Sequence, residues 1–237
     1  MKIIGADTKE FSEARNRLVH GKYNGAYFYA KEIEQNIIPR VKTDRPWDLL
    51  GKRSTGSFDN AIVFLHNNAE HEKIYGGWLG KYYKNQIFVV NQPSTERYVK
   101  SLGLPCIYLP VSCDLDYVRK FRTKKTKEVC HVGNRWGWRR ADIEKYVPPD
   151  VEFAPWDMKR DDLLRFMAPY KKVYAVARCA VEAKALGCEV LKCQTDMDPE
   201  DFPMLDNKEA AKILQKELDK YDKRSQKAQN HKVSKGL

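Results

Sequence analysis

Short apolar runs alternate with amphipathic segments along most of this chain. Uninterrupted apolar runs are typical of buried strands, whereas apolar residues at every third or fourth position are typical of helices. The expected strands span residues 2–5, 61–65, 87–90, 106–109, 128–132, 151–154, 173–176 and 189–192. The expected helices lie near residues 26–37, 94–102, 114–121, 139–146, 161–167 and 180–186, with a last one from 206 towards 227. The alternation predicts an α/β fold with parallel sheets.

The strand and helix pattern begins again after residues 119–127, a basic stretch without any acidic residue. We therefore predict two Rossmann-like domains, residues 1–121 and 122–206, followed by a C-terminal helix and basic tail, residues 207–237. Right-handed crossovers gather the carboxyl ends of parallel strands at one edge of each sheet. We expect the two domains to face each other across a cleft lined by these edges.

The charge balance points to anionic partners. The formal net charge is +11, and a field of this sign attracts nucleic acid, anionic membrane surfaces or phosphorylated small molecules. Much of the excess lies in residues 119–127 and in the Lys-rich tail after Tyr221. Basic tails also serve as solubilising or disordered segments, so the charge alone does not select a partner.

Apolar residues make up 42% of the chain and charged residues 32%, which indicates a globular protein. No apolar run approaches the roughly 20 residues of a membrane-spanning helix, and charge interrupts the N-terminus too early for a signal peptide. The six cysteines are Cys106, Cys113, Cys130, Cys179, Cys188 and Cys193. Their spacing shows no close pairs, so we expect reduced thiols in a cytoplasmic protein and no metal site.

The pattern of apolar and small residues at 173–190 predicts a strand, a turn, a helix of small residues and a second strand. The alanines of this helix would let it lie close to a sheet. Glu182 would then lie near the carboxyl ends of the strands, where open α/β sheets bind ligands. A carboxylate at this place can accept both hydroxyls of a ribose. The alternative is an ordinary strand–helix–strand unit with a surface glutamate.

The loop at residues 131–140 combines two glycines, one of them Gly133, with Arg135, Arg139 and Arg140. Backbone amides at a helix start and guanidinium groups together make a phosphate site. The two tryptophans of the loop would stack on a base or pack against the sheet.

Two further positions are candidates for ligand contacts. The strand at 61–65 places His66 at its carboxyl end, where a polar side chain can face a ligand. Gly25 stands at an expected helix start and allows close backbone approach. Turn formation is the alternative role of both residues.

Several segments together resemble a known family. A glycine-containing N-terminal loop leads into a helix, and a later strand ends in His66-Asn67. Further along come Val89-Val-Asn-Gln-Pro-Ser-Thr-Glu96, Ile107-Tyr-Leu-Pro-Val-Ser-Cys-Asp114, His131-Val-Gly-Asn-Arg135 and Val181-Glu-Ala-Lys-Ala-Leu-Gly-Cys-Glu-Val190. Together they resemble a compact GT-B glycosyltransferase, similar to the retaining group 1 family, over roughly residues 20 to 195. Residues 109–114 are similar to the family's segment before its second domain, and residues 182–187 match its Glu-Ala-x-Ala-x-Gly helix.

The resemblance implies a role for each matching residue. Glu182 would bind the donor's ribose, and Arg135 with Arg139 or Arg140 would neutralise the diphosphate leaving group. His66 would contact the transferred sugar. Gly25 would line the cleft, and Gly133 and Arg178 would complete the donor site. Such enzymes generally need no metal, because positive side chains and helix dipoles stabilise the departing diphosphate.

We therefore expect a retaining glycosyltransferase that uses a nucleotide-diphosphate sugar, with a UDP-sugar as the favoured donor. The positive charge suggests a polyanionic acceptor, and a hydroxymethylated DNA base flipped into the cleft is the leading candidate. The alternative is a non-catalytic nucleic-acid-binding protein on a degenerate nucleotide-sugar fold. This alternative is favoured by Tyr174, which stands where the family usually carries an earlier carboxylate, and by the basic stretches. The sequence gives no indication of the oligomeric state.

Overall fold

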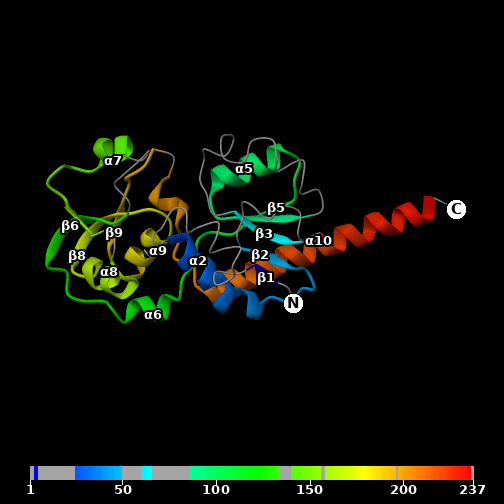
Figure 1. Ribbon diagram of the computed structural model, residues 1–237, viewed down its shortest axis with the longest axis horizontal. Helices are drawn as coiled ribbons and strands as arrows, with labels where there is room; N and C mark the ends of the chain where they lie inside the picture. The colour runs from blue at the N-terminus through cyan, green and yellow to red at the C-terminus, as the bar shows by residue number, and fades with distance from the viewer. Residues whose placement is uncertain are drawn as a thin grey trace.

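The computed structural model describes residues 3–4, 25–49, 60–65, 86–133, 140–155, 158–195 and 197–235. Within these residues the strands form two separate sheets, in which every pair of neighbouring strands is parallel. The prediction of an α/β fold with parallel sheets is therefore confirmed. We call the part built on the first sheet the N-terminal lobe and the part built on the second the C-terminal lobe (Figure 1).

The sheet of the N-terminal lobe has the strand order β1-β2-β3-β4-β5. Its strands are β1 Ile3–Ile4, β2 Trp47–Asp48, β3 Ile62–Leu65, β4 Ile87–Val90 and β5 Cys106–Tyr108. All residues of β3 and β4 are buried, because a parallel sheet is covered on both faces. This burial explains why both strands are uninterrupted apolar runs in the sequence.

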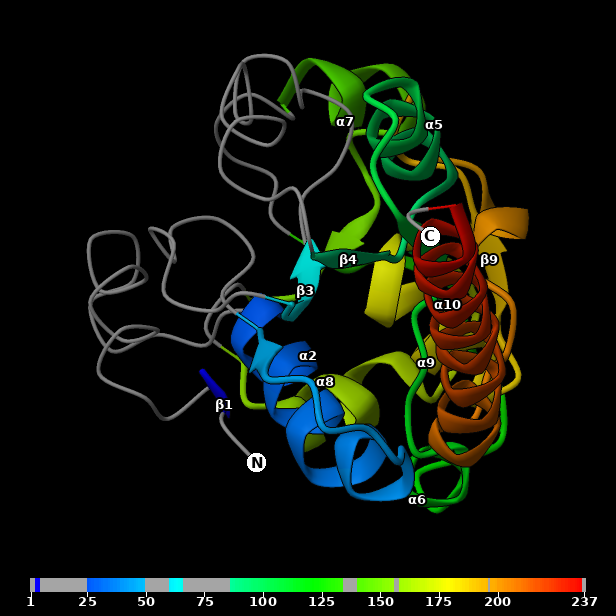
Figure 2. The same ribbon diagram turned by 90° about the vertical axis from the view of Figure 1, so that its right-hand side faces the viewer.

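Helices cover both faces of this sheet. Helix α2, Gly25–Glu32, continues through a π-helical turn, η1 Ile33–Ile37, into a 3-10 turn, η2 Ile38–Arg40. Helix α5, Pro93–Ser101, begins directly after β4. Helices α2 and α5 lie on opposite sides of the sheet (Figures 1 and 2). The predicted apolar stripe at residues 26–37 is buried at Ile33 and Ile37, which face the core.

The sheet of the C-terminal lobe has the strand order β7-β6-β8-β9. Its strands are β6 Lys127–His131, β7 Glu152–Phe153, β8 Tyr170–Tyr174 and β9 Glu189–Leu191. Its helices are α6 Leu115–Arg119, α7 Arg140–Tyr146, α8 Arg160–Met167, α9 Ala177–Ala185 and the 3-10 turn η4 Pro199–Asp201. Five of the residues of α9 are buried, since its small side chains let the helix lie close to its neighbours.

Several elements differ from those expected. Strand β2 was not predicted, because its two residues are too few to form a pattern. Strand β8 begins at Tyr170, three residues early, and its charged Lys171 and Lys172 pair across strands with Glu128 and Glu189. The last helix, α10 Asn207–Lys235, runs well past residue 227.

Helix α10 connects the two lobes. It starts beside the C-terminal lobe, next to a backbone bridge between Cys113 and Asp206. It then runs along the N-terminal lobe and projects beyond it (Figure 1). Tyr221 Oη bonds both the amide and the carbonyl of Cys106, at 3.0 Å each, and thereby covers the edge strand β5. One hydrophobic core cluster includes buried residues from both lobes and from α10.

Candidate functional site

The structure describes only some of the residues that the sequence suggested for the site. His66, Arg135 and Arg139 lie outside the described residues. Arg140 begins helix α7, but its side chain is not described, and Gly25 begins α2. Gly133 follows β6 with a φ of 132°, a conformation that side chains rarely allow, so glycine is required for its backbone rather than for space.

Arg178 and Glu182 lie together on helix α9, which begins directly after the carboxyl end of β8. The helical spacing of four residues places them on one face, and Arg178 Nε donates to Glu182 Oε1 at 2.9 Å. From helix α8, Arg160 Nε donates to the same oxygen at 3.1 Å. Glu182 is 2% exposed, so the predicted surface alternative for this residue is wrong.

Glu32, from the end of α2, completes this group from the other lobe. Its Oε2 forms ion pairs of 3.2 Å with Arg160 Nη1 and with Arg178 Nη2. Its Oε1 accepts from Asn207 Nδ2 at 2.7 Å and from the amide of Asp114 at 3.2 Å. Glu32 therefore ties together α2, the segment between the lobes and the start of α10. We call Glu32, Arg160, Arg178 and Glu182 the interlobe cluster.

The interlobe cluster combines two carboxylates with two guanidinium groups, so its formal charges cancel. Both hydrogen bonds to Glu182 reach Oε1, and Oε2 has no partner within the described part of the chain. Oε2 is thus the oxygen that can accept a ligand hydroxyl. Because Glu182 is 2% exposed, a ribose would reach it only if neighbouring groups moved. The cluster can also act as an internal connection between the lobes, since buried ion pairs need well-matched partners.

Sequence reasoning found Arg178 and Glu182 but missed Glu32 and Arg160. The first pair is local, four residues apart on one helix. Glu32 lies in a helix whose apolar spacing indicates only that one face is buried. Arg160 begins a helix with several charged residues, and its charge does not distinguish it from them. Their roles depend on contacts between distant segments, and no local pattern marks them.

The thiols nearest the cluster are not nucleophiles at neutral pH. Burial raises the pKa of Cys179 to about 12, with the nearby carboxylate of Glu182 adding to the effect and Arg178 opposing it. Burial also raises the pKa of Cys113. Both groups therefore stay protonated, and the thiolate is the reactive form.

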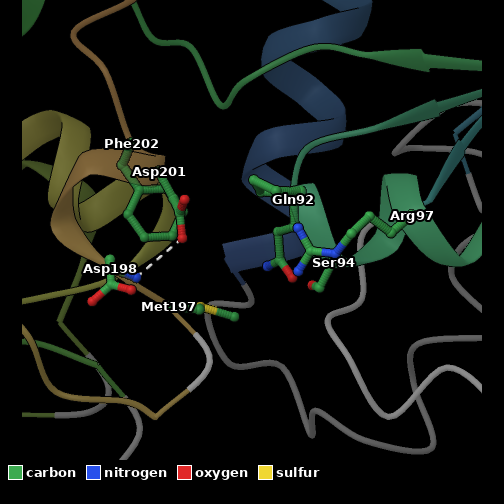
Figure 3. A pocket seen from close by; sticks show the side chains of 8 residues that line it. Gln92, Ser94, Arg97, Met197, Asp198, Asp201 and Phe202 are labelled. Carbon is green, nitrogen blue, oxygen red and sulfur yellow. Dashed lines mark hydrogen bonds between the residues drawn. The ribbon is translucent and has the colours of Figure 1, made fainter.

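A second feature is a pocket of about 230 Å³ between the lobes, which we call the interlobe pocket. The N-terminal lobe supplies residues just after β4, and the C-terminal lobe supplies residues after β9 (Figure 3). Its lining consists of Gln92, Pro93, Ser94, Arg97, Met197, Asp198, Asp201 and Phe202. The carboxyl-terminal edges of the two sheets thus both contribute to this pocket, as expected for ligand sites in parallel sheets.

No group of three or more His, Cys, Asp or Glu residues suited to a metal ion occurs among the described residues. The same residues include no helix that is both long and apolar enough to span a membrane. All six cysteines are free thiols.

Comparisons with protein-family models, with curated proteins and with solved structures found no match for this chain. The resemblance to group 1 glycosyltransferases therefore rests on the sequence motifs alone, and the function has to be argued from the residues.

Proposed function

We propose that this protein is a glycosyltransferase of GT-B type, which moves a sugar from a nucleotide-diphosphate sugar to an acceptor hydroxyl. The observation that carries the proposal is the position of Arg178 and Glu182. They lie in the helix after the carboxyl end of β8, and Arg178 contacts the opposite lobe through Glu32. Carboxylate and guanidinium groups at this edge suit the ribose and the diphosphate of a nucleotide sugar.

In this proposal each group has a defined task. Glu182 Oε2 accepts a ribose hydroxyl, since its Oε1 is occupied by the two arginines. Arg178 turns from Glu32 towards the diphosphate, where a guanidinium stabilises the charge that develops on the leaving group. Arg135, with Arg139 or Arg140, adds positive charge, and the backbone at Gly133 approaches the phosphates. His66 contacts the transferred sugar, and retention of configuration follows from the family resemblance.

The proposed donor is a UDP-sugar and the proposed acceptor is a hydroxymethylated base in DNA. The net charge of +11 supports an acceptor of this kind, because it attracts polyanions. The enzyme would bind one base flipped out of the duplex. The free cysteines suit a reducing compartment such as the cytoplasm.

A panel of nucleotide sugars tests the donor site through thermal unfolding of the full chain. A true donor at a hundredfold excess over its Kd should stabilise the protein by about 2.7 kcal/mol. Glu182→Gln should lose this stabilisation, because the neutral amide binds a ribose hydroxyl less strongly than a carboxylate does. Each variant is compared with its own ligand-free state, since the change also weakens the interlobe cluster.

The matched control is Glu189→Gln, which removes an exposed carboxylate from β9. Its response to the donor should equal that of the unchanged protein. If no nucleotide sugar stabilises the unchanged protein, the proposed donor site is wrong.

The second candidate is a nucleic-acid-binding protein without catalytic activity. It is favoured by Tyr174, half-buried at the end of β8 in place of a carboxylate, and by the burial of Glu182 among ion pairs. Such a protein would bind DNA with the same affinity in the presence and absence of any nucleotide sugar. Binding titrations under both conditions separate the two candidates.

A further inference from the structure

We propose that the interlobe pocket binds a phosphorylated polyol of the size of a monosaccharide. The phosphate would lie at the start of α5, and the hydroxyl groups would face Gln92 and the two aspartates across the pocket. This site goes beyond the proposed glycosyl transfer, because none of its residues belongs to the interlobe cluster or to the predicted donor residues.

The start of α5 forms the part of the interlobe pocket that would bind the phosphate. This helix has nine residues, and its N-cap residue, Gln92, makes no capping hydrogen bond with its side chain. The amide of Ser94 belongs to the first turn, which has no hydrogen-bond acceptors within the helix, so the positive end of the helix dipole faces the pocket. Arg97 lies one turn further on, and helical side chains lean towards the N-terminus. Figure 3 shows its guanidinium extending towards Gln92 and the opposite wall.

The side chain of Gln92 gives evidence for a ligand that does not depend on the helix start. Gln92 is 6% exposed and lines the pocket. Its Oε1 is buried and has no hydrogen-bond partner in the part of the chain that the structure describes. Buried polar atoms are nearly always hydrogen-bonded, so this oxygen can accept from a donor that enters the pocket. A ligand hydroxyl is such a donor.

The opposite wall supplies acceptors for further hydroxyls. Asp198 and Asp201 hold each other in a capping box around η4, and Asp198 Oδ1 also pairs with Lys192 Nζ at 2.6 Å. These bonds partly offset the negative charge while leaving carboxylate lone pairs for hydroxyl donors. The phosphate is thereby directed to α5 and the polyol to η4. A volume of about 230 Å³ suits a sugar phosphate, and equally the ribose phosphate part of a nucleotide.

Calorimetric titration of the full chain at low salt tests the ligand class. Ribose 5-phosphate should bind at least tenfold more tightly than ribose or inorganic phosphate, because it engages both ends of the pocket. Uridine monophosphate tests whether the ligand is a nucleotide or a free sugar phosphate. Binding as tight as that of ribose 5-phosphate identifies a nucleotide, and weaker binding identifies a free sugar phosphate. Ribose 5-phosphate that binds no more tightly than inorganic phosphate would overturn the proposal.

Variants then test the assignment of residues. Arg97→Gln changes an exposed residue, so the fold should be retained, and it should weaken ribose 5-phosphate binding at least tenfold. Gln92→Met keeps the size of the side chain and should weaken binding of the sugar phosphate more than that of inorganic phosphate. The control is Arg119→Gln, an exposed arginine of α6 paired with Asp116, which should bind as the unchanged protein does. Unaltered binding in Arg97→Gln, or an equal loss in the control, contradicts the site.

Discussion

Glu32 has the densest set of contacts in the interlobe cluster. Its two oxygens accept hydrogen bonds from one backbone amide and one side-chain amide, and they form ion pairs with two guanidinium groups. The residue is 5% exposed, so these bonds replace water almost completely. A buried carboxylate satisfied in this way fixes its partners in one arrangement. Removing it leaves Arg160 and Arg178 without their carboxylate from the N-terminal lobe.

We predict that Glu32→Ala lowers the free energy of unfolding by about 3–5 kcal/mol, the usual effect of removing one partner of a buried ion pair. Urea denaturation measures this loss. Glu128→Ala is the control, because Glu128 is exposed and its pairing with Lys171 should contribute less than about 1 kcal/mol. Equal losses in the two variants would show that the interlobe cluster does not connect the lobes energetically.

Helix α10 protects an exposed edge of the first sheet. Strand β5 stands at the end of the strand order, and an uncovered edge strand invites pairing with other chains. Tyr221 supplies the partners for both backbone groups of Cys106. Helix α10 therefore satisfies backbone groups of the edge strand, as pairing with a further strand would. The sequence predicted the helix but not this contact, because the two residues are 115 positions apart.

We expect Tyr221→Phe to lower the free energy of unfolding by about 1–3 kcal/mol, since a hydrogen bond typically contributes 0.5–1.5 kcal/mol and two are lost. Hydrogen exchange should show faster exchange of the Cys106 amide. Tyr108→Phe removes only a contact of 3.5 Å to Asp201 and should have a much smaller effect. Unchanged exchange at Cys106 would contradict the role assigned to Tyr221.

Part of the basic stretch at residues 119–127 is engaged in contacts within the C-terminal lobe. Lys125 Nζ donates to Ala168 O at 2.8 Å and to Cys188 Sγ at 3.0 Å, and Lys127 bonds Glu152 and Tyr170. These lysines serve the fold of the C-terminal lobe. A shallow groove beside α10 is lined instead by Arg40, Lys208, Lys212 and Lys216, with one acidic residue, Asp219. This groove is the better candidate for contact with a polyanion.

The double variant Lys208→Gln with Lys216→Gln tests this assignment. If each lysine contacts one phosphate, the slope of log affinity against log salt should fall by about 1.8 for duplex DNA, because each contact contributes about 0.9. Fluorescence titration at several salt concentrations measures the slope. Lys171→Gln with Lys172→Gln is the control, since both lysines pair with acids on the second sheet. A slope equal to that of the unchanged protein would show that the groove does not contact the DNA phosphates.

Local patterns of residues predict the class of fold and most of the elements. Alternating apolar runs specify buried parallel strands, and helical spacing brings Arg178 and Glu182 to one face of α9, because both effects act over a few neighbouring residues. The remaining features depend on contacts between segments that are distant in the sequence. Glu32 meets Asn207 across 175 positions, and the interlobe pocket joins the end of β4 to the turn after β9. Such contacts depend on how the lobes pack, and no local pattern of residues encodes that packing.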